Sequence, residues 1–247
     1  MNRNFLDQFS KLQFIFLKRD ISGQNGIKLK KDIELPIIEN EELNLKNIVE
    51  AILFLYGIHD NYLNKEYYRN IILEVDNQKS GVKFLPISYL NIYDKKALIM
   101  ALGLINLNLD DETTYLTIIE SSNRLYFETK ESYYLDIFNE YLCKAKEKYD
   151  IWQIDYQMAI FEFNSKNYEN AIELFSIALK KCDVEEFKEE IIRLIELSNV
   201  KIDYQRAIDL FNKNRYNEAL VIFESLKEDM KEDEELENYI NLSTEKL

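Results

Sequence analysis

Residues 154–175 read IDYQMAIFEFNSKNYENAIELF, and residues 202–223 read IDYQRAIDLFNKNRYNEALVIF. The second stretch follows the first at an offset of 48 residues, and 11 of the 22 aligned positions are identical. Self-similarity at a fixed offset is typical of repeat architectures, in which each helical unit packs against the next. The sequence therefore predicts that this part of the chain is built from helical repeats.

Both copies contain the same pattern of two small residues and one aromatic residue. The pattern comprises Ala159, Ala171 and Phe175 in the first copy, and Ala207, Ala219 and Phe223 in the second. Two helices can approach closely where alanine removes side-chain bulk, and an aromatic ring fills the space beside the contact. Each copy is thus expected to form a helix–turn–helix unit.

This spacing resembles the tetratricopeptide repeat, over residues of about 152–185 and 200–233. The resemblance implies an all-α fold, a right-handed α-solenoid of helix–turn–helix units with a helical region before it. Lys166 and Asn214 stand where that family has a turn glycine. The 48-residue offset leaves room for one extra helix, over residues 185–198. We expect a non-repeat helical region over residues 1–110 and a repeat region over residues 111–247.

The composition supports a mostly helical chain, since it has only 5 Gly and 2 Pro in 247 residues. Apolar periodicity predicts helices over residues 5–17, 45–56, 64–75, 94–107 and 132–149. We expect Gly57 to end the second of these helices, and the third to pack antiparallel against the second. Residues 27–38 alternate enough to form a strand or an extended arm, because Pro36 is unsuited to a helix interior.

The net charge of −14 comes from 31 basic and 45 acidic side chains. It argues against nonspecific binding to nucleic acid or to anionic membranes, because both need a basic surface. It is compatible with a basic partner. No apolar run approaches the ~20 residues that span a bilayer, and we expect a cytoplasmic protein. Cys143 and Cys182 lack metal-type spacing and are expected to be reduced thiols.

Sequence motifs for catalysis are scarce. His59 is the single histidine, so the usual zinc ligand sets cannot be completed. The glycines form no phosphate-binding loop. Carboxylates are plentiful, and residue counts alone leave a paired-acid or magnesium site open. We expect a protein that is not an enzyme and that holds no cofactor or metal.

The resemblance also implies a binding surface, because the first helices of such repeats line a concave groove. The matching positions are Gln153, Tyr156, Ile160 and Asn164 in the first copy, and Lys201, Tyr204, Ile208 and Asn212 in the second. Repeated aromatic and amide side chains are suited to an extended peptide. The alternative is that the Tyr and Ile side chains pack between helices and the Asn residues lie at helix ends.

These observations favour a non-catalytic protein–protein interaction module or scaffold that binds a peptide or partner protein. Two alternatives remain. A peptide could change the curvature of the array, which would make the chain a sensor or regulator. An acidic chain could also occupy a basic site on an enzyme and inhibit it.

Overall fold

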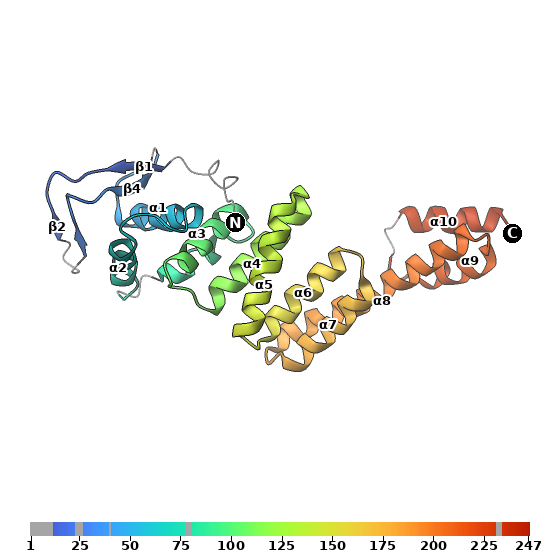
Figure 1. Cartoon of the computed structure of the whole chain (residues 1–247). Helices are drawn as coiled ribbons and strands as arrows, with labels where there is room; N and C mark the ends of the chain where they lie inside the picture. Colours follow the sequence, from blue (N-terminus) through green and yellow to red (C-terminus); the bar gives the residue numbers. More distant parts are fainter. Residues whose placement is uncertain (1–11, 23–26, 40, 78–80, 231–233) are drawn as a thin grey trace. The chain divides into compact units, whose positions relative to one another are not determined.

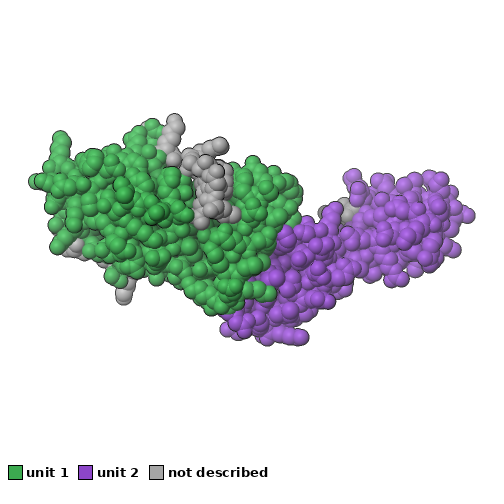
Figure 2. Space-filling view, in the orientation of Figure 1, with its two compact units in different colours: residues 1–149 green, residues 150–247 purple. Residues whose placement is uncertain are grey.

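The computed structural model describes residues 12–22, 27–39, 41–77, 81–230 and 234–247. Their contacts divide the chain into two compact units, residues 1–149 and 150–247 (Figure 2). Most described residues are helical, which confirms the helical class, although unit 1 also contains four short strands (Figure 1). None of the helices in the described ranges is long and apolar enough to cross a membrane. The boundary at residue 110 was drawn from the repeat pattern and stays a prediction.

Unit 1 begins with a two-part β arm. Strand β1 (Leu12–Ile15) pairs antiparallel with β4 (Leu35–Ile38), and β2 (Ile21–Ser22) pairs with β3 (Lys28–Leu29). The extended segment predicted over residues 27–38 is confirmed. The helix predicted over residues 5–17 is wrong for its described part, because Leu12–Ile15 forms a strand; residues 5–11 lie outside the described residues.

Tyrosine hydroxyls fasten this arm to the helical part of unit 1. Helix α2 (Lys65–Asp76) supplies Tyr68, whose hydroxyl donates to the Glu34 carbonyl oxygen. The Tyr67 hydroxyl accepts from the Lys30 amide at 2.8 Å. Tyr62, just before α2, donates from its hydroxyl to Glu34 Oε2 at 3.3 Å. The phenol groups thus satisfy backbone and carboxylate groups that the short ladders leave without partners.

Helices α1 (Leu45–Ile58) and α3 (Asp94–Asn106) cross with their backbones in contact. A Cβ at Gly57 would overlap the carbonyl oxygen of Ile99, and one at Gly103 would overlap that of Leu53. The expectation that Gly57 ends α1 is therefore wrong, since the helix continues to Ile58 and the glycine serves the crossing. The main helical partner of α1 is α3, and its contact with α2 is slight.

The remainder of unit 1 follows the sequence closely. Two 3₁₀ turns, η2 (Val82–Phe84) and η3 (Ile87–Tyr89), lead into α3. Helices α4 (Glu112–Thr129) and α5 (Ser132–Lys148) complete the unit. Asp111 caps α4 in a capping box with Thr114, in which the Asp111 carboxylate accepts the Thr114 amide at 3.0 Å. Such a cap satisfies two amides that a helix N-terminus leaves unpaired.

The described residues of unit 2 form five helices, of which α8 is the longest. The helices are α6 (Trp152–Asn164), α7 (Tyr168–Lys181), α8 (Glu185–Asn212), α9 (Tyr216–Ser225) and α10 (Glu234–Glu245). The separate helix predicted over residues 185–198 is wrong, because α8 runs without a break into the second copy. Its first half packs in a hydrophobic cluster with α6 and α7, and its second half packs with α9 and α10.

The repeated residues of unit 2 form the centres of these two clusters. The four alanines and two phenylalanines of the shared pattern are fully buried. The turns also match. Lys166 and Asn214 both adopt a left-handed backbone, with φ of 64° and 61°. In each turn that residue's amide and the next one donate to carbonyls at the end of the first helix. This arrangement terminates a helix in the way a C-terminal glycine usually does.

The α1–α3 crossing yields a direct stability test. We expect Gly103→Ala to lower the free energy of unfolding by about 1–3 kcal/mol, because the added methyl group must displace backbone atoms. Asn70→Ala, on the exposed face of α2, is the control and should stay within about 0.5 kcal/mol. Urea unfolding followed by circular dichroism measures both. Equal midpoints for the two variants would contradict the close crossing.

Candidate functional site

The structure places the tyrosines predicted to line a groove inside helix packing. The Tyr156 hydroxyl donates to Glu190 Oε1 of α8 at 2.8 Å, and its ring centre lies 5.9 Å from that of Phe175. Tyr204 is 9% exposed, and its ring lies 5.9 Å from that of Phe223. Tyr156 therefore connects α6 with α7 and α8, and Tyr204 connects α8 with α9.

The other six predicted positions divide into two groups. Ile160 and Ile208 are partly buried against the same two clusters. Asn164 and Asn212 are exposed at the last residues of α6 and α8, and Gln153 and Lys201 are partly exposed. The isoleucines thus join the packing. Asn164, Asn212 and Lys201 remain accessible, whereas the side-chain oxygen of Gln153 is buried. A peptide groove along these eight residues stays a prediction.

The packing of Tyr156 and Tyr204 predicts that truncating these side chains destabilises unit 2. We expect Tyr204→Ala to destabilise unit 2 by about 3 kcal/mol, because it removes a buried ring between α8, α9 and α10. Tyr93→Ala, which truncates an exposed ring in unit 1, should cost less than about 0.5 kcal/mol. Thermal melts of the two variants provide the comparison. A Tyr204→Ala protein that melts like wild type would favour the groove over the core.

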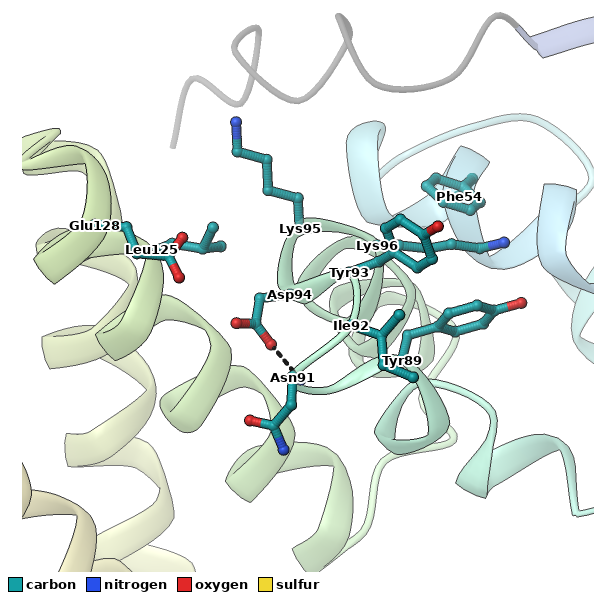
Figure 3. A pocket seen from close by; sticks show the side chains of 10 residues that line it. All are labelled: Phe54, Tyr89, Asn91, Ile92, Tyr93, Asp94, Lys95, Lys96, Leu125 and Glu128. Atoms are coloured by element: carbon teal, nitrogen blue, oxygen red, sulfur yellow. Dashed lines mark hydrogen bonds between the residues drawn. The ribbon is translucent and has the colours of Figure 1, made fainter.

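A cleft of about 510 Å³ in unit 1 has the properties of a binding site. It surrounds the N-terminal end of α3 (Figure 3). Its lining residues are Phe54, Tyr89, Asn91, Ile92, Tyr93, Asp94, Lys95, Lys96, Leu125 and Glu128. The volume is within the range of small-molecule and side-chain pockets, and the mixture of aromatic walls with a few polar groups is typical of them.

A charge network lies beside the cleft and includes two of its lining residues, Tyr89 and Lys96. Glu50 lies in the buried part of α1, Ile48–Ile58, in which it is the single charged residue, and it is 2% exposed. Lys96 Nζ lies 2.6 Å from Glu50 Oε2, and the Tyr89 hydroxyl donates to Glu50 Oε1 at 2.8 Å. The Lys96 ammonium also lies 4.1 Å from the centre of the Tyr89 ring. A carboxylate at this depth requires such partners, because burial without them would cost several kcal/mol.

The protonation of Lys96 limits the chemistry that this cleft can perform. Burial alone lowers the pKa of Lys96, but hydrogen bonds to Glu50 and Tyr89 outweigh it, and the net pKa lies above the ordinary lysine value. The ammonium is therefore charged at neutral pH and cannot act as a base or nucleophile. Asp94 is also engaged, since its Oδ1 accepts the Asn91 amide at 2.8 Å. The arrangement favours holding a ligand over transferring protons.

Two apolar side chains that line the cleft are open to solvent. Ile92 and Tyr93, which are consecutive residues, are 68% and 63% exposed. In Figure 3, Leu125 and Glu128 approach from α4 and Phe54 from α1, with the α3 residues between them. Exposed apolar side chains beside a recess are typical of a surface that contacts another molecule.

Sequence reasoning missed this site. Glu50 stands 39 residues before Tyr89 in the chain, and no motif connects it with Tyr89 and Lys96. One signal was present, because Glu50 is the only charged residue in the run Ile48–Ile58, IVEAILFLYGI. A lone carboxylate in a buried helix needs a cation or a donor nearby. The described residues contain no cluster of three or more His, Cys, Asp or Glu that could hold a metal ion.

Comparisons with known proteins return no match. No protein-family model, curated protein or solved structure is similar enough to this chain to be informative.

The charge network can be tested by a double-mutant cycle. We expect Lys96→Met to lower the free energy of unfolding by about 3 kcal/mol, because the Glu50 carboxylate remains buried without its cation. Adding Glu50→Leu to Lys96→Met should recover most of this loss. Lys46→Met is the matched control, since Lys46 is largely exposed and lies 3.8 Å from Glu50; its cost should be below about 1 kcal/mol. Additive effects of Lys96→Met and Glu50→Leu would show that the pair is not coupled.

Proposed function

We propose that this chain is a non-catalytic protein-binding module, and that the cleft of unit 1 receives an apolar side chain of its partner. The observation that carries the proposal is the exposure of Ile92 and Tyr93 at the mouth of a recess with an aromatic wall. Phe54, which lines this recess, is almost fully buried. A partner side chain inserted here would remove both exposed residues from water and anchor the contact.

Charge pairing within the cleft supports binding over catalysis. Lys96 and Glu50 neutralise each other, and Asp94 is bound to a backbone amide. An acid–base catalyst needs a group with a pKa near the working pH, positioned to accept or donate a proton. The raised pKa of Lys96 moves it away from that range.

We further propose that unit 2 is a tetratricopeptide-like, right-handed solenoid that presents a second contact surface. Support comes from the two clusters built on the same alanine–alanine–phenylalanine pattern, and from the matching left-handed turns at Lys166 and Asn214. A partner bound to this surface would contact the exposed side-chain amides of Asn164 and Asn212.

The cleft proposal is tested with N-acetyl-phenylalanine amide, a single apolar side chain with capped ends. At about 0.3 kcal/mol for each of its heavy atoms, its affinity should be in the millimolar range. We titrate the isotope-labelled full chain and follow amide shifts by NMR. Saturable shifts are expected for residues 89–96 and 125–128.

The matched variants are Ile92→Glu and Val221→Glu, which place a charge at equally exposed apolar positions in unit 1 and unit 2. Ile92→Glu should weaken binding about tenfold or more, and Val221→Glu should leave it unchanged. Shifts spread over both units, or binding that survives Ile92→Glu, would refute the cleft as the contact site.

A further inference from the structure

One edge of strand β1, the outer edge, has no partner strand among the described residues. β1 pairs with β4 on one side, and within the described part of the chain nothing pairs with its other side. An open edge presents unpaired backbone donors and acceptors to any extended segment that approaches. This surface is separate from the cleft and does not depend on the function proposed for it.

Pro36 shows which backbone groups face this edge. Pro36 stands opposite Phe14 in the ladder, and proline has no amide hydrogen to donate. In an antiparallel pair the two opposite residues either exchange both hydrogen bonds or exchange none. Phe14 and Pro36 therefore form a pair without hydrogen bonds, and the amide and carbonyl of Phe14 point away from β4. By the period of two, those of Leu12 point the same way.

The strand is short, but it carries none of the residues that usually block an edge. Residues 12–17 read LQFIFL, without a charge, a proline or a glycine. Phe14 and Phe16 are 39% and 62% exposed. Natural edge strands are commonly blocked by lysine, proline or a bulge. Such a segment is suited to pairing with another strand, in which backbone hydrogen bonds give affinity and alternate side chains give specificity.

Charge defines one end of the binding surface. β1 leads into Lys18 and Arg19, which are exposed and form no ion pair with any described residue. The adjacent carboxylate of Asp20 is engaged, since its Oδ1 accepts the Lys31 amide at 2.9 Å. Two unpaired cations in a chain of net charge −14 favour an acidic group on the partner.

We propose that the outer edge of β1 binds an extended segment of a partner protein by strand addition. The segment carries apolar side chains at alternating positions beside Phe14 and Phe16, and acidic residues that lie against Lys18 and Arg19. A second copy of this chain is less suited. Two chains of charge −14 repel each other, whereas an acidic segment alone is attracted to Lys18 and Arg19.

The probe is a fluorescent peptide, EEETVFVTV, whose acidic N-terminus meets Lys18 and Arg19 in an antiparallel arrangement. Binding to the full chain is measured by fluorescence anisotropy. Phe14→Pro removes the outward amide hydrogen and leaves the β1–β4 ladder intact, because that amide is unused there. Phe14→Ala is the matched control, since it loses the same ring and keeps the amide. We expect Phe14→Pro to bind about tenfold more weakly than Phe14→Ala.

Charge is tested separately with the peptide KKKTVFVTV and the double variant Lys18→Glu, Arg19→Glu. Wild type should prefer the acidic peptide, with a preference that falls as salt is added, and the double variant should prefer the basic one. If Phe14→Pro unfolds the arm, a peptide methylated at the amides that face β1 replaces it and should lose binding to wild type.

Equal affinities of Phe14→Pro and Phe14→Ala, or of the acidic and basic peptides for wild type, would overturn the proposal. A wild-type dimer that Phe14→Pro converts to a monomer in sedimentation would assign the edge to a second copy instead. Ile92→Glu should leave peptide binding unchanged, so a failure of the cleft and a failure of the strand edge are distinguishable.

Discussion

The contact of the α1 and α3 backbones at Gly57 and Gly103 is the constraint on which unit 1 depends. Helix axes usually lie 8–10 Å apart, at a distance set by the side chains between them. Glycine at both contact points removes those side chains, so that each helix touches the other's carbonyl oxygens. The resulting proximity brings Lys96 of α3 within hydrogen-bonding distance of Glu50 on α1. The charge network beside the cleft is thus a consequence of a crossing that tolerates no side chain.

A buried ion pair seldom improves stability over well-packed apolar residues, because both charges lose their hydration. Glu50 therefore lowers the stability of the buried part of α1, and a role in the site would explain its presence. In this structure it fixes the Tyr89 hydroxyl and the Lys96 ammonium at once. These two contacts hold one wall of the cleft rigid, and a rigid recess costs a partner less conformational entropy to bind than a mobile one.

The sequence was sufficient where local periodicity decided the structure. Helices α1, α3 and α5 and the repeat helices carry apolar residues at helical spacing, and they form close to the predicted positions. The sequence was insufficient where contacts between residues far apart in the chain determine the structure. LQFIFL reads equally well as helix or strand until Pro36 and its neighbours pair with it. Gly57 reads as a helix end until Ile99 lies against it, and the cleft depends on Glu50 and Lys96, which no short-range pattern connects.

A comparison of the two repeat copies indicates which part of the chain is suited to contact a partner. Most positions that are identical in the two copies are buried or partly buried, as at Ala159 and Ala207 or Phe175 and Phe223. Many exposed and partly exposed positions have diverged, as where Phe161 of the first copy corresponds to Asp209 of the second. Asn164 and Asn212 are the exposed pair that is identical, and a ligand contacted in the same way by both copies would have to use such positions. Packing is therefore the physical reason for the duplication, and the apolar cleft and strand edge of unit 1 are better placed than the repeated tyrosines to recognise a partner.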